Sequence, residues 1–465
     1  METKRSNFSG NFGFVMAAAG SAVGLGNIWR FPYLAAKHGG GAFLLVYIIM
    51  ALTFGFSLLT TEIAIGRKTK QGPLTAYGVM NKKFGFLGYF AWIVPVMILP
   101  YYCAIGGWVL KYLIAFVTGG RSAAAADGYF TGHITSLASP IIWLVVFVAM
   151  TAFVVYNGVE KGIEKYSKIL MPILIVLIIG IGIFSLFLSH TDESGVTRTG
   201  LQGLAIYVKP DFSGMTAGGF LSLLMDAIGQ LFYSISVAMG IMIAYGSYVK
   251  KDTSMMKSIN QIEFFDTLVA FLAGLMIVPA VFCFMGTEGM SAGPGLMFIS
   301  LPKIFDAMGI VGTIVGILFF VMVTFAAVTS SVSVMEAIVS GIMDKWHLPR
   351  KKTTIMVTIY ALVIGIVVCL GYNLLYFEYT LPNGSVAQIL DIMDYISNSI
   401  LMPVVALITC ILVGYFCKPK TIIDEVTSDG SKFGRKTLYI VMIKYVMPVI
   451  FVVLLLQAMG ILKLG

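Results

Sequence analysis

Carboxylates inside long apolar runs are the first residues of this sequence that could do chemistry. They are Glu62, Asp226, Asp266, Glu336 and Asp394, each inside or at the end of such a run. An unpaired charge in hydrocarbon costs several kcal/mol, so carboxylates there pair with cations or meet ions. The pattern therefore predicts ion pairs or ion-binding sites within the protein.

Two arginine–aspartate pairs are expected at opposite ends of these runs. Arg30 is placed to meet Asp394 near the outer side, and Arg5 is placed to meet Asp344 near the inner side. Such pairs can be purely structural. Because these two would bracket a central site from both faces, we interpret them as gates, and we assign Tyr248 to the gates with them.

Two clusters of glycine and polar residues interrupt the apolar runs. Residues 20–27 read Gly-Ser-Ala-Val-Gly-Leu-Gly-Asn, and residues 229–236, about five runs later, read Gly-Gln-Leu-Phe-Tyr-Ser-Ile-Ser. Close helix packing explains a single cluster as well as a functional break does. Two breaks at matching positions of successive halves are typical of inverted-repeat transporters with discontinuous helices. Helix N-termini suit an anion and freed carbonyls suit a cation, so we expect a zwitterion accompanied by Na⁺.

A later run carries four hydroxyls, those of Thr329, Ser330, Ser331 and Ser333. Each one alone is better explained by a hydrogen bond to the carbonyl four residues earlier in its own helix. Together they offer hard oxygen ligands of the kind that hard cations prefer. A broken helix opposite them would add carbonyls, so this face is a candidate Na⁺ site.

The elements that position these residues are predicted to be membrane-spanning helices. The chain has 465 residues, of which 58% are hydrophobic and 11% charged, which is too little polar surface for a soluble globule. The runs are too long and too continuously apolar for the strands of a membrane barrel. With roughly 20 apolar residues needed per helix, about eleven spans are expected. They are 12–37, 41–65, 88–118, 140–158, 163–188, 219–249, 258–286, 309–342, 354–374, 386–416 and 437–460.

Lysine and arginine are concentrated in alternate connections, which places the N-terminus in the cytoplasm and the C-terminus outside a bacterial inner membrane. The net charge of +9 then suits an anionic leaflet of the lipid bilayer, and nucleic-acid binding is excluded.

The expected organisation is a cytoplasmic segment (1–11), a first inverted repeat of helices 1–5 (12–188), an extracellular loop (189–218), a second repeat of helices 6–10 (219–416), a cytoplasmic loop (417–436), and helix 11 with an external C-terminus (437–465).

Residues 21–33, Ser-Ala-Val-Gly-Leu-Gly-Asn-Ile-Trp-Arg-Phe-Pro-Tyr, followed by Gly-Gly-Gly-Ala-Phe at 39–43, resemble the most specific signature of the neurotransmitter:sodium symporter family. The resemblance covers nearly the whole chain, and bacterial members of the family transport amino acids. It implies a five-plus-five inverted repeat with discontinuous helices 1 and 6, and symport by alternating access rather than an enzymatic activity.

The resemblance implies two Na⁺ sites. The first would use the Ala22 carbonyl, Asn27, Ser234 and Asp266, together with the substrate carboxylate. The second would use the carbonyls of Gly20, Val23 and Ala326 and the hydroxyls of Thr329 and Ser330.

The resemblance also implies a substrate site. The substrate carboxylate would meet the amides near Leu25 and Gly26 and the hydroxyl of Tyr102. Amine transporters of the family carry Asp where this chain has Gly24, so we expect a neutral amino acid, bulky and hydrophobic or aromatic. The implied site comprises Ala22, Gly24, Leu25, Gly26, Ile98, Tyr102, Phe232, Tyr233, Ser234, Ser236, Met239, Ser330 and Val334.

Chloride is expected to be unnecessary. Tyr47, Gln230 and Ser234 match positions that hold chloride in animal relatives, but Asp266 would supply a fixed negative charge there. Proton coupling through Asp266 and Glu62 stays open beside Na⁺.

Two other functional classes are less consistent with the sequence. A channel would need a continuous polar pore face, whereas the polar residues here gather at one depth. An intramembrane enzyme would need a nucleophile beside a base or a metal cluster, whereas the four His, at 38, 133, 190 and 347, lie near span ends or in loops. The oligomeric state stays open.

Overall fold

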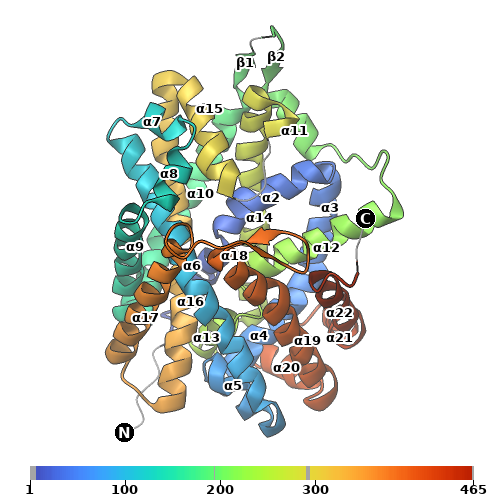
Figure 1. Cartoon of the computed structure of the whole chain (residues 1–465). Helices are drawn as coiled ribbons and strands as arrows, with labels where there is room; N and C mark the ends of the chain where they lie inside the picture. Colours follow the sequence, from blue (N-terminus) through green and yellow to red (C-terminus); the bar gives the residue numbers. More distant parts are fainter. Residues whose placement is uncertain (1–6, 193, 290–293, 463–465) are drawn as a thin grey trace.

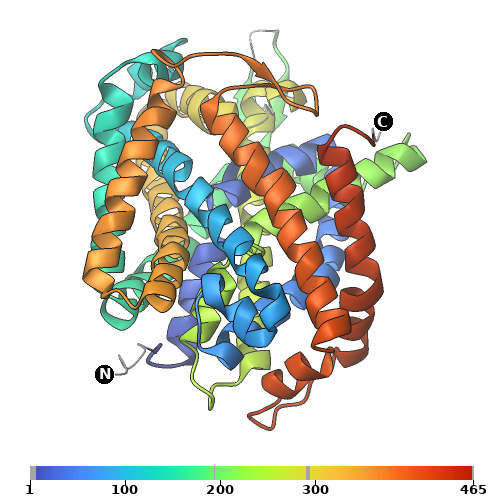
Figure 2. The ribbon, with the colours of Figure 1, turned by 60° about the horizontal axis from the view of Figure 1, so that its bottom comes forward.

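The structure is a computed structural model that describes residues 7–192, 194–289 and 294–462. Long helices form a single bundle, and two small strand pairs are its only sheets within the described residues (Figures 1 and 2). The bundle confirms an all-α integral membrane protein, because its long helices are apolar enough to cross a bilayer.

Nine uninterrupted helical segments in the described part of the chain pass the length and hydropathy requirements for a membrane span. They are Gly41–Thr69 (α3, Gly41–Met50, and α4, Phe56–Thr69), Lys82–Val117 (mainly α6, Gly85–Val117), Ser139–Tyr156 (α9), Val159–Leu186 (mainly α10, Lys165–Leu186), Met255–Met285 (α14), Gly309–Trp346 (α16), Arg350–Leu370 (α17), Ile389–Phe416 (α18, Ile389–Asp394, and α19, Met402–Ile411) and Lys436–Ala458 (α21, Lys436–Val441, and α22, Met447–Ala458).

Two further segments are broken helices. The helices α1 (Asn11–Ala22) and α2 (Leu25–Lys37) meet at a bend of 54° and together meet the requirements for a tenth span. The helices α12 (Ala217–Ser234) and α13 (Ile241–Ser247) are separated by six residues, Ile235–Gly240. The first break falls inside its predicted cluster (20–27), whereas the second begins at the end of its cluster (229–236), whose first six residues are still helical. The count of eleven spans, the inverted repeat and the segment boundaries derived from it stay predictions.

The remaining elements are short and lie at the ends of the bundle or beside it. Strands β1 (Ser189–Thr191) and β2 (Thr197–Thr199) form an antiparallel pair at one end (Figure 1). The short elements are α5 (Pro73–Met80), α7 (Arg121–Ala125), α8 (Tyr129–Thr135), β1 (Ser189–Thr191), β2 (Thr197–Thr199), α11 (Gly200–Val208), α15 (Leu301–Ala307), β3 (Tyr379–Thr380), β4 (Val386–Ala387) and α20 (Lys420–Val426).

Glycines let the second broken helix approach its neighbour closely. A Cβ on Gly66 of α4 would lie 2.0 Å from the carbonyl oxygen of Ile243 in α13. A Cβ on Gly246 of α13 would lie 2.3 Å from the carbonyl oxygen of Ile63 in α4. Both distances are far below van der Waals contact, so the two backbones touch. This close packing fixes the position of α13 beside the central site.

Candidate sodium and substrate site

A small cavity lies between the two helix breaks, α6 and α16. It encloses about 30 Å³, enough for about two water molecules. An amino acid therefore requires the walls to separate. No lining residue is charged, and the lining consists of Ser21, Ala22, Gly24, Asn27, Ile98, Tyr102, Tyr233, Ser236, Met239, Ser330 and Val334.

The break in the first helix presents backbone to this cavity because glycines occupy it. The Leu25 amide, at the start of α2, donates a hydrogen bond to the Tyr102 hydroxyl at 3.4 Å. A Cβ on Gly24 would lie 3.1 Å from Ser330 Oγ, and one on Gly26 would lie 2.4 Å from the Tyr233 ring. Amides at a helix N-terminus carry partial positive charge, so this edge of the cavity suits an anionic group.

A buried cluster surrounds Asp266 on α14. The Ser234 hydroxyl donates to Asp266 Oδ1 at 2.5 Å, and the Asn27 amide donates to the same oxygen at 3.3 Å. Tyr47 donates to Asp266 Oδ2 at 3.4 Å. Three residues predicted for the first Na⁺ site thus lie together, and they come from α2, α12 and α14. The fourth, Ala22, has its carbonyl hydrogen-bonded to the Gly24 amide at 3.0 Å.

A second oxygen cluster surrounds Ser330 on α16. The Ser330 hydroxyl lies 3.4 Å from the carbonyl oxygen of Gly20, 3.1 Å from that of Ser21 and 3.3 Å from that of Val23. These carbonyls are freed by the break between α1 and α2. The Thr329 hydroxyl, one residue earlier on α16, donates at 2.9 Å to the carbonyl of Phe325, four residues before it, and lies 3.1 Å from the carbonyl oxygen of Ala326. Ser330 thus lies beside Gly20 and Val23 of the predicted second Na⁺ site, whereas Thr329 and Ala326 contact each other within α16. The Ser21 carbonyl, which accepts from Ser330, also belongs to this cluster and was not predicted from the sequence.

The break in the second helix is strained and is held by polar contacts. Ser236 and Ala238 have positive φ angles of 55° and 60°, which are uncommon for residues other than glycine. The Ser236 hydroxyl donates to the Ser21 carbonyl at 3.0 Å, which joins the two breaks directly. The Ala238 amide donates to Glu62 Oε1 at 2.6 Å. Glu62 thus holds the unwound backbone of the second break.

A larger cavity of about 270 Å³ lies beside Arg30 of the predicted outer gate. Arg30 and Tyr233 both line it, and Tyr233 also lines the small central cavity, so its side chain lies between the two. Among the described residues, no direct ion pair joins Arg30 to Asp394. Asp394 instead accepts hydrogen bonds from Tyr101 at 3.0 Å and Asn398 at 2.6 Å.

On the opposite side, the predicted partner Arg5 lies outside the described residues. Asp344 accepts a hydrogen bond from the Gly72 amide at 2.5 Å. Tyr248 donates to Glu336 Oε1 at 2.6 Å, and Arg350 forms an ion pair with the same carboxylate. Glu336 was expected to pair, but its partner was not predicted, because no local pattern indicates that Arg350, 14 positions later, folds back onto it.

The lining of the central cavity lacks four predicted substrate residues, namely Leu25, Gly26, Phe232 and Ser234. The Phe232 ring packs against Phe54 and Phe451, with ring centroids 5.9 Å and 5.4 Å apart. It lines the outer cavity rather than the central one. The reason is helical phase, because Phe232 and Tyr233 are adjacent in α12 and point to different sides.

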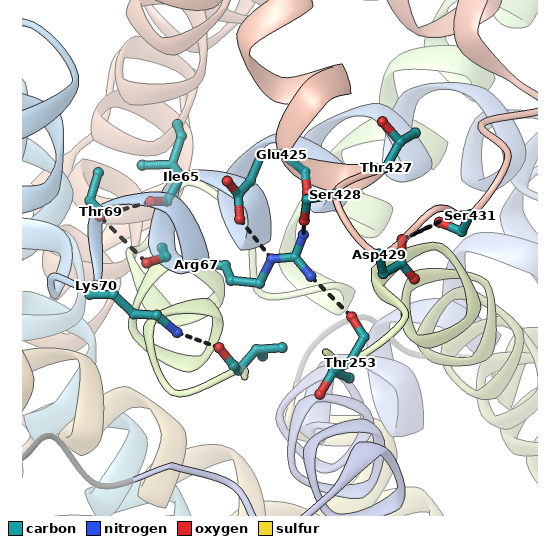
Figure 3. Close-up of polar contacts among 12 residues, drawn as sticks. Ile65, Arg67, Thr69, Lys70, Thr253, Glu425, Thr427, Ser428, Asp429 and Ser431 are labelled. Atoms are coloured by element: carbon teal, nitrogen blue, oxygen red, sulfur yellow. Dashed lines mark hydrogen bonds and ion pairs between the residues drawn. The ribbon is translucent and has the colours of Figure 1, made fainter. Parts of the chain in front are cut away.

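A cluster around Arg67 ties three segments together on the side of the lysine-rich connections (Figure 3). The fully buried guanidinium contacts the Glu425 carboxylate at 2.8 Å, the Ser428 hydroxyl at 2.8 Å and the Thr253 carbonyl at 3.0 Å. It also donates to the Glu425 carbonyl. Arg67 therefore links α4, the connection between α13 and α14, and the segment containing α20.

A model of the sodium:neurotransmitter symporter family matches residues 5–130 and 129–463. The chain belongs to this family. It is thus a multi-span membrane protein of a sodium-dependent symporter family, which is not a class of enzymes. An uncharacterized sodium-dependent transporter of Bacillus subtilis is 32% identical over 99% of each chain. The human sodium- and chloride-dependent GABA transporter 2 is 26% identical over 75% of this chain and 64% of its own. The crystal structure of MhsT in complex with L-phenylalanine is similar with a TM-score of 0.85 and 34% identity, over 98% of this chain and 100% of that one.

Proposed function

We propose that this protein imports a bulky neutral L-amino acid, aromatic or branched, together with two Na⁺ ions and without chloride. The observation that carries the proposal is the central cavity, whose lining combines tyrosine rings, aliphatic side chains and freed backbone but no charged side chain. A charged substrate side chain would have no partner there. MhsT, similar over nearly the whole chain, is known with bound L-phenylalanine.

The two ends of a zwitterion match the two kinds of backbone at the breaks. The Leu25 amide and the Tyr102 hydroxyl lie 3.4 Å apart and would both donate to a carboxylate. Carbonyls freed at the breaks and the Ser236 hydroxyl would accept from an ammonium group. Met239 in the lining is unbranched and adaptable, so side chains of different shape would be accepted.

The two oxygen clusters support two Na⁺ ions of different character. The Ser330 cluster is neutral, with carbonyl and hydroxyl oxygens only. The Asp266 cluster contains a buried carboxylate, which would neutralise a cation beside the substrate carboxylate. Chloride would then have no charge to balance. This argument supports chloride independence, and it requires Asp266 to be ionised when Na⁺ is bound.

Alternating access is supported by the position of Tyr233 between the central and outer cavities. Rotation of this side chain would open the central cavity to the outer one. Closure would bring Arg30 toward Asp394, and on the other face Arg5 and Asp344 would have the corresponding role.

The test is uptake into proteoliposomes of labelled tryptophan, tyrosine, phenylalanine and leucine, with Na⁺ or choline and with chloride or gluconate outside. Uptake of these substrates in sodium gluconate is expected, because the Asp266 carboxylate would supply the negative charge that chloride would otherwise bring. A strict preference for glycine or glutamate would refute the substrate class. Loss of uptake in gluconate would refute chloride independence alone.

A further inference from the structure

A groove between α9 and α17 lies outside the transport machinery. The two helices lie side by side on one flank of the bundle (Figures 1 and 2). The groove has a volume of about 250 Å³. Many of its lining side chains are exposed on the outside of the bundle, so in a membrane the groove opens toward the lipid. It is lined by Ala149, Ala152, Phe153, Tyr156, Thr354, Ile355, Thr358 and Ile359. Small alanines on α9 create the space, and the lining suits a hydrocarbon chain.

A hydroxyl without a partner stands in this apolar lining. Thr354 is 1% exposed, and its Oγ1 has no hydrogen-bond partner in the described structure. Its neighbours behave differently, because Thr353 donates to the Pro349 carbonyl at 3.2 Å and Thr358 donates to the Thr354 carbonyl at 2.7 Å. A buried hydroxyl without a partner costs about 1–3 kcal/mol. The oxygen is covered by neighbouring side chains, so an acceptor that a bound molecule brings into the groove would reach it once those side chains shift.

Cations lie at one end of the same groove. Lys351 and Lys352 are exposed, and Lys351 Nζ lies 5.3 Å from the centroid of the Tyr156 ring, which itself lines the groove. Thr354 is three residues from Lys351, which corresponds to about 4.5 Å along a helix. Arg350 does not add to this charge, because it is paired with Glu336. Glu160 is an exposed acid in the neighbouring connection.

We infer that this groove binds one anionic glycerophospholipid of the leaflet on the lysine-rich side. Its phosphate lies at Lys351 and Lys352, an ester carbonyl accepts the Thr354 hydroxyl proton, and one acyl chain runs along the alanine face of α9. The order of groups in such a lipid, with charge outermost, ester next and hydrocarbon inside, matches the order of cations, hydroxyl and apolar lining along α17. No part of this site overlaps the residues of the transport cavity.

The test is native mass spectrometry of the purified full chain titrated with phosphatidylglycerol or phosphatidylcholine of the same acyl chains. The wild type is expected to retain one phosphatidylglycerol preferentially. Lys351→Gln/Lys352→Gln should reduce that preference by about fivefold for each lysine, because each contributes to attraction of an anionic lipid. Thr354→Val should lower the affinity for both lipids by about three- to tenfold, because both carry ester carbonyls.

Matched controls separate the site from general effects. Lys345→Gln changes a lysine that also lies over a tyrosine ring, that of Tyr89 at 5.6 Å, and should leave the preference unchanged. Thr353→Val changes a hydroxyl that already has a partner and lies outside the groove lining, and should change either affinity less than twofold. Phosphatidylglycerol with a photoreactive acyl chain should label peptides of α9 and α17. Labelling spread evenly over all exposed helices, unaltered lipid affinity in Thr354→Val, or a dimer that seals the groove would overturn the inference.

Discussion

Replacing Asp266 by Asn tests the proposed first Na⁺ site most directly. The change keeps the size of the side chain and removes the only charge from a cluster that also contains Asn27 and Ser234. Two opposite charges 4 Å apart attract by about 4 kcal/mol at an effective dielectric constant of 20. Part of this is offset because the amide oxygen of the Asn side chain can still contact the cation. We therefore expect a loss of about 2–3 kcal/mol, or roughly 30- to 150-fold in Na⁺ affinity.

The assay is an Na⁺ titration of labelled amino-acid binding to the purified chain, at constant ionic strength with choline. Asp266→Asn should shift the half-saturating Na⁺ concentration upward by that factor in gluconate. Replacing gluconate with chloride should recover part of the loss, because Tyr47 and Ser234 would then donate to the added anion. Tyr47→Phe is the matched control, since it removes a long 3.4 Å hydrogen bond and leaves the charge. Tyr47→Phe should weaken Na⁺ binding by about 1 kcal/mol or less, which is no more than about fivefold in affinity.

The melting temperature of each variant, measured in choline, shows whether a loss of Na⁺ affinity is due to misfolding. Without Na⁺, Asp266 is a fully buried carboxylate, so the Asn variant should unfold at the same temperature as the wild type or higher. An unchanged Na⁺ titration in a folded Asp266→Asn protein would refute the assignment of this residue to a cation site.

Three further changes test other parts of the structure. Thr329→Val with Ser330→Ala removes the hydroxyls of the second oxygen cluster and should abolish Na⁺-driven uptake, measured in proteoliposomes. Gly26→Ala places a methyl group 2.4 Å from the Tyr233 ring, so overpacking of about 1–3 kcal/mol should weaken amino-acid binding, measured by scintillation proximity. Arg67→Lys keeps the charge but loses most of the contacts of the guanidinium, and should destabilise the fold by about 3 kcal/mol or more, measured by thermal unfolding.

Each of these predictions has a contradicting result. Undiminished Na⁺-driven uptake in the Thr329 and Ser330 double variant would remove the second site from the mechanism. Wild-type affinity in Gly26→Ala would mean that the Tyr233 ring moves without consequence for the substrate. Equal melting temperatures for Arg67→Lys and the wild type would show that the cluster in Figure 3 contributes little to stability.

The positions of the spans could be predicted from the sequence because the signal is local. A helix in hydrocarbon must satisfy its own backbone, so each span has to be a continuous apolar run of sufficient length. The predicted run 41–65 corresponds to Gly41–Thr69, and 258–286 corresponds to Met255–Met285. The helix breaks were visible for the same reason, because glycine and polar residues at membrane depth are costly unless the chain uses them. Gly24 and Ser236 mark the two breaks in the sequence and in the structure.

Contacts between distant residues were decided only by the tertiary structure. Asn27 and Asp266 are 239 positions apart, and the predicted cluster depended on the family resemblance rather than on spacing. No local pattern indicates that Arg67 meets Glu425, 358 positions later, or that Thr354 lacks the hydrogen bond that Thr358 forms. Hydropathy fixes which residues enter the membrane, but it does not fix the rotation of each helix about its axis. That rotation is set by packing against neighbours, and it determines that Tyr233 faces the substrate cavity while Phe232, one residue earlier, does not.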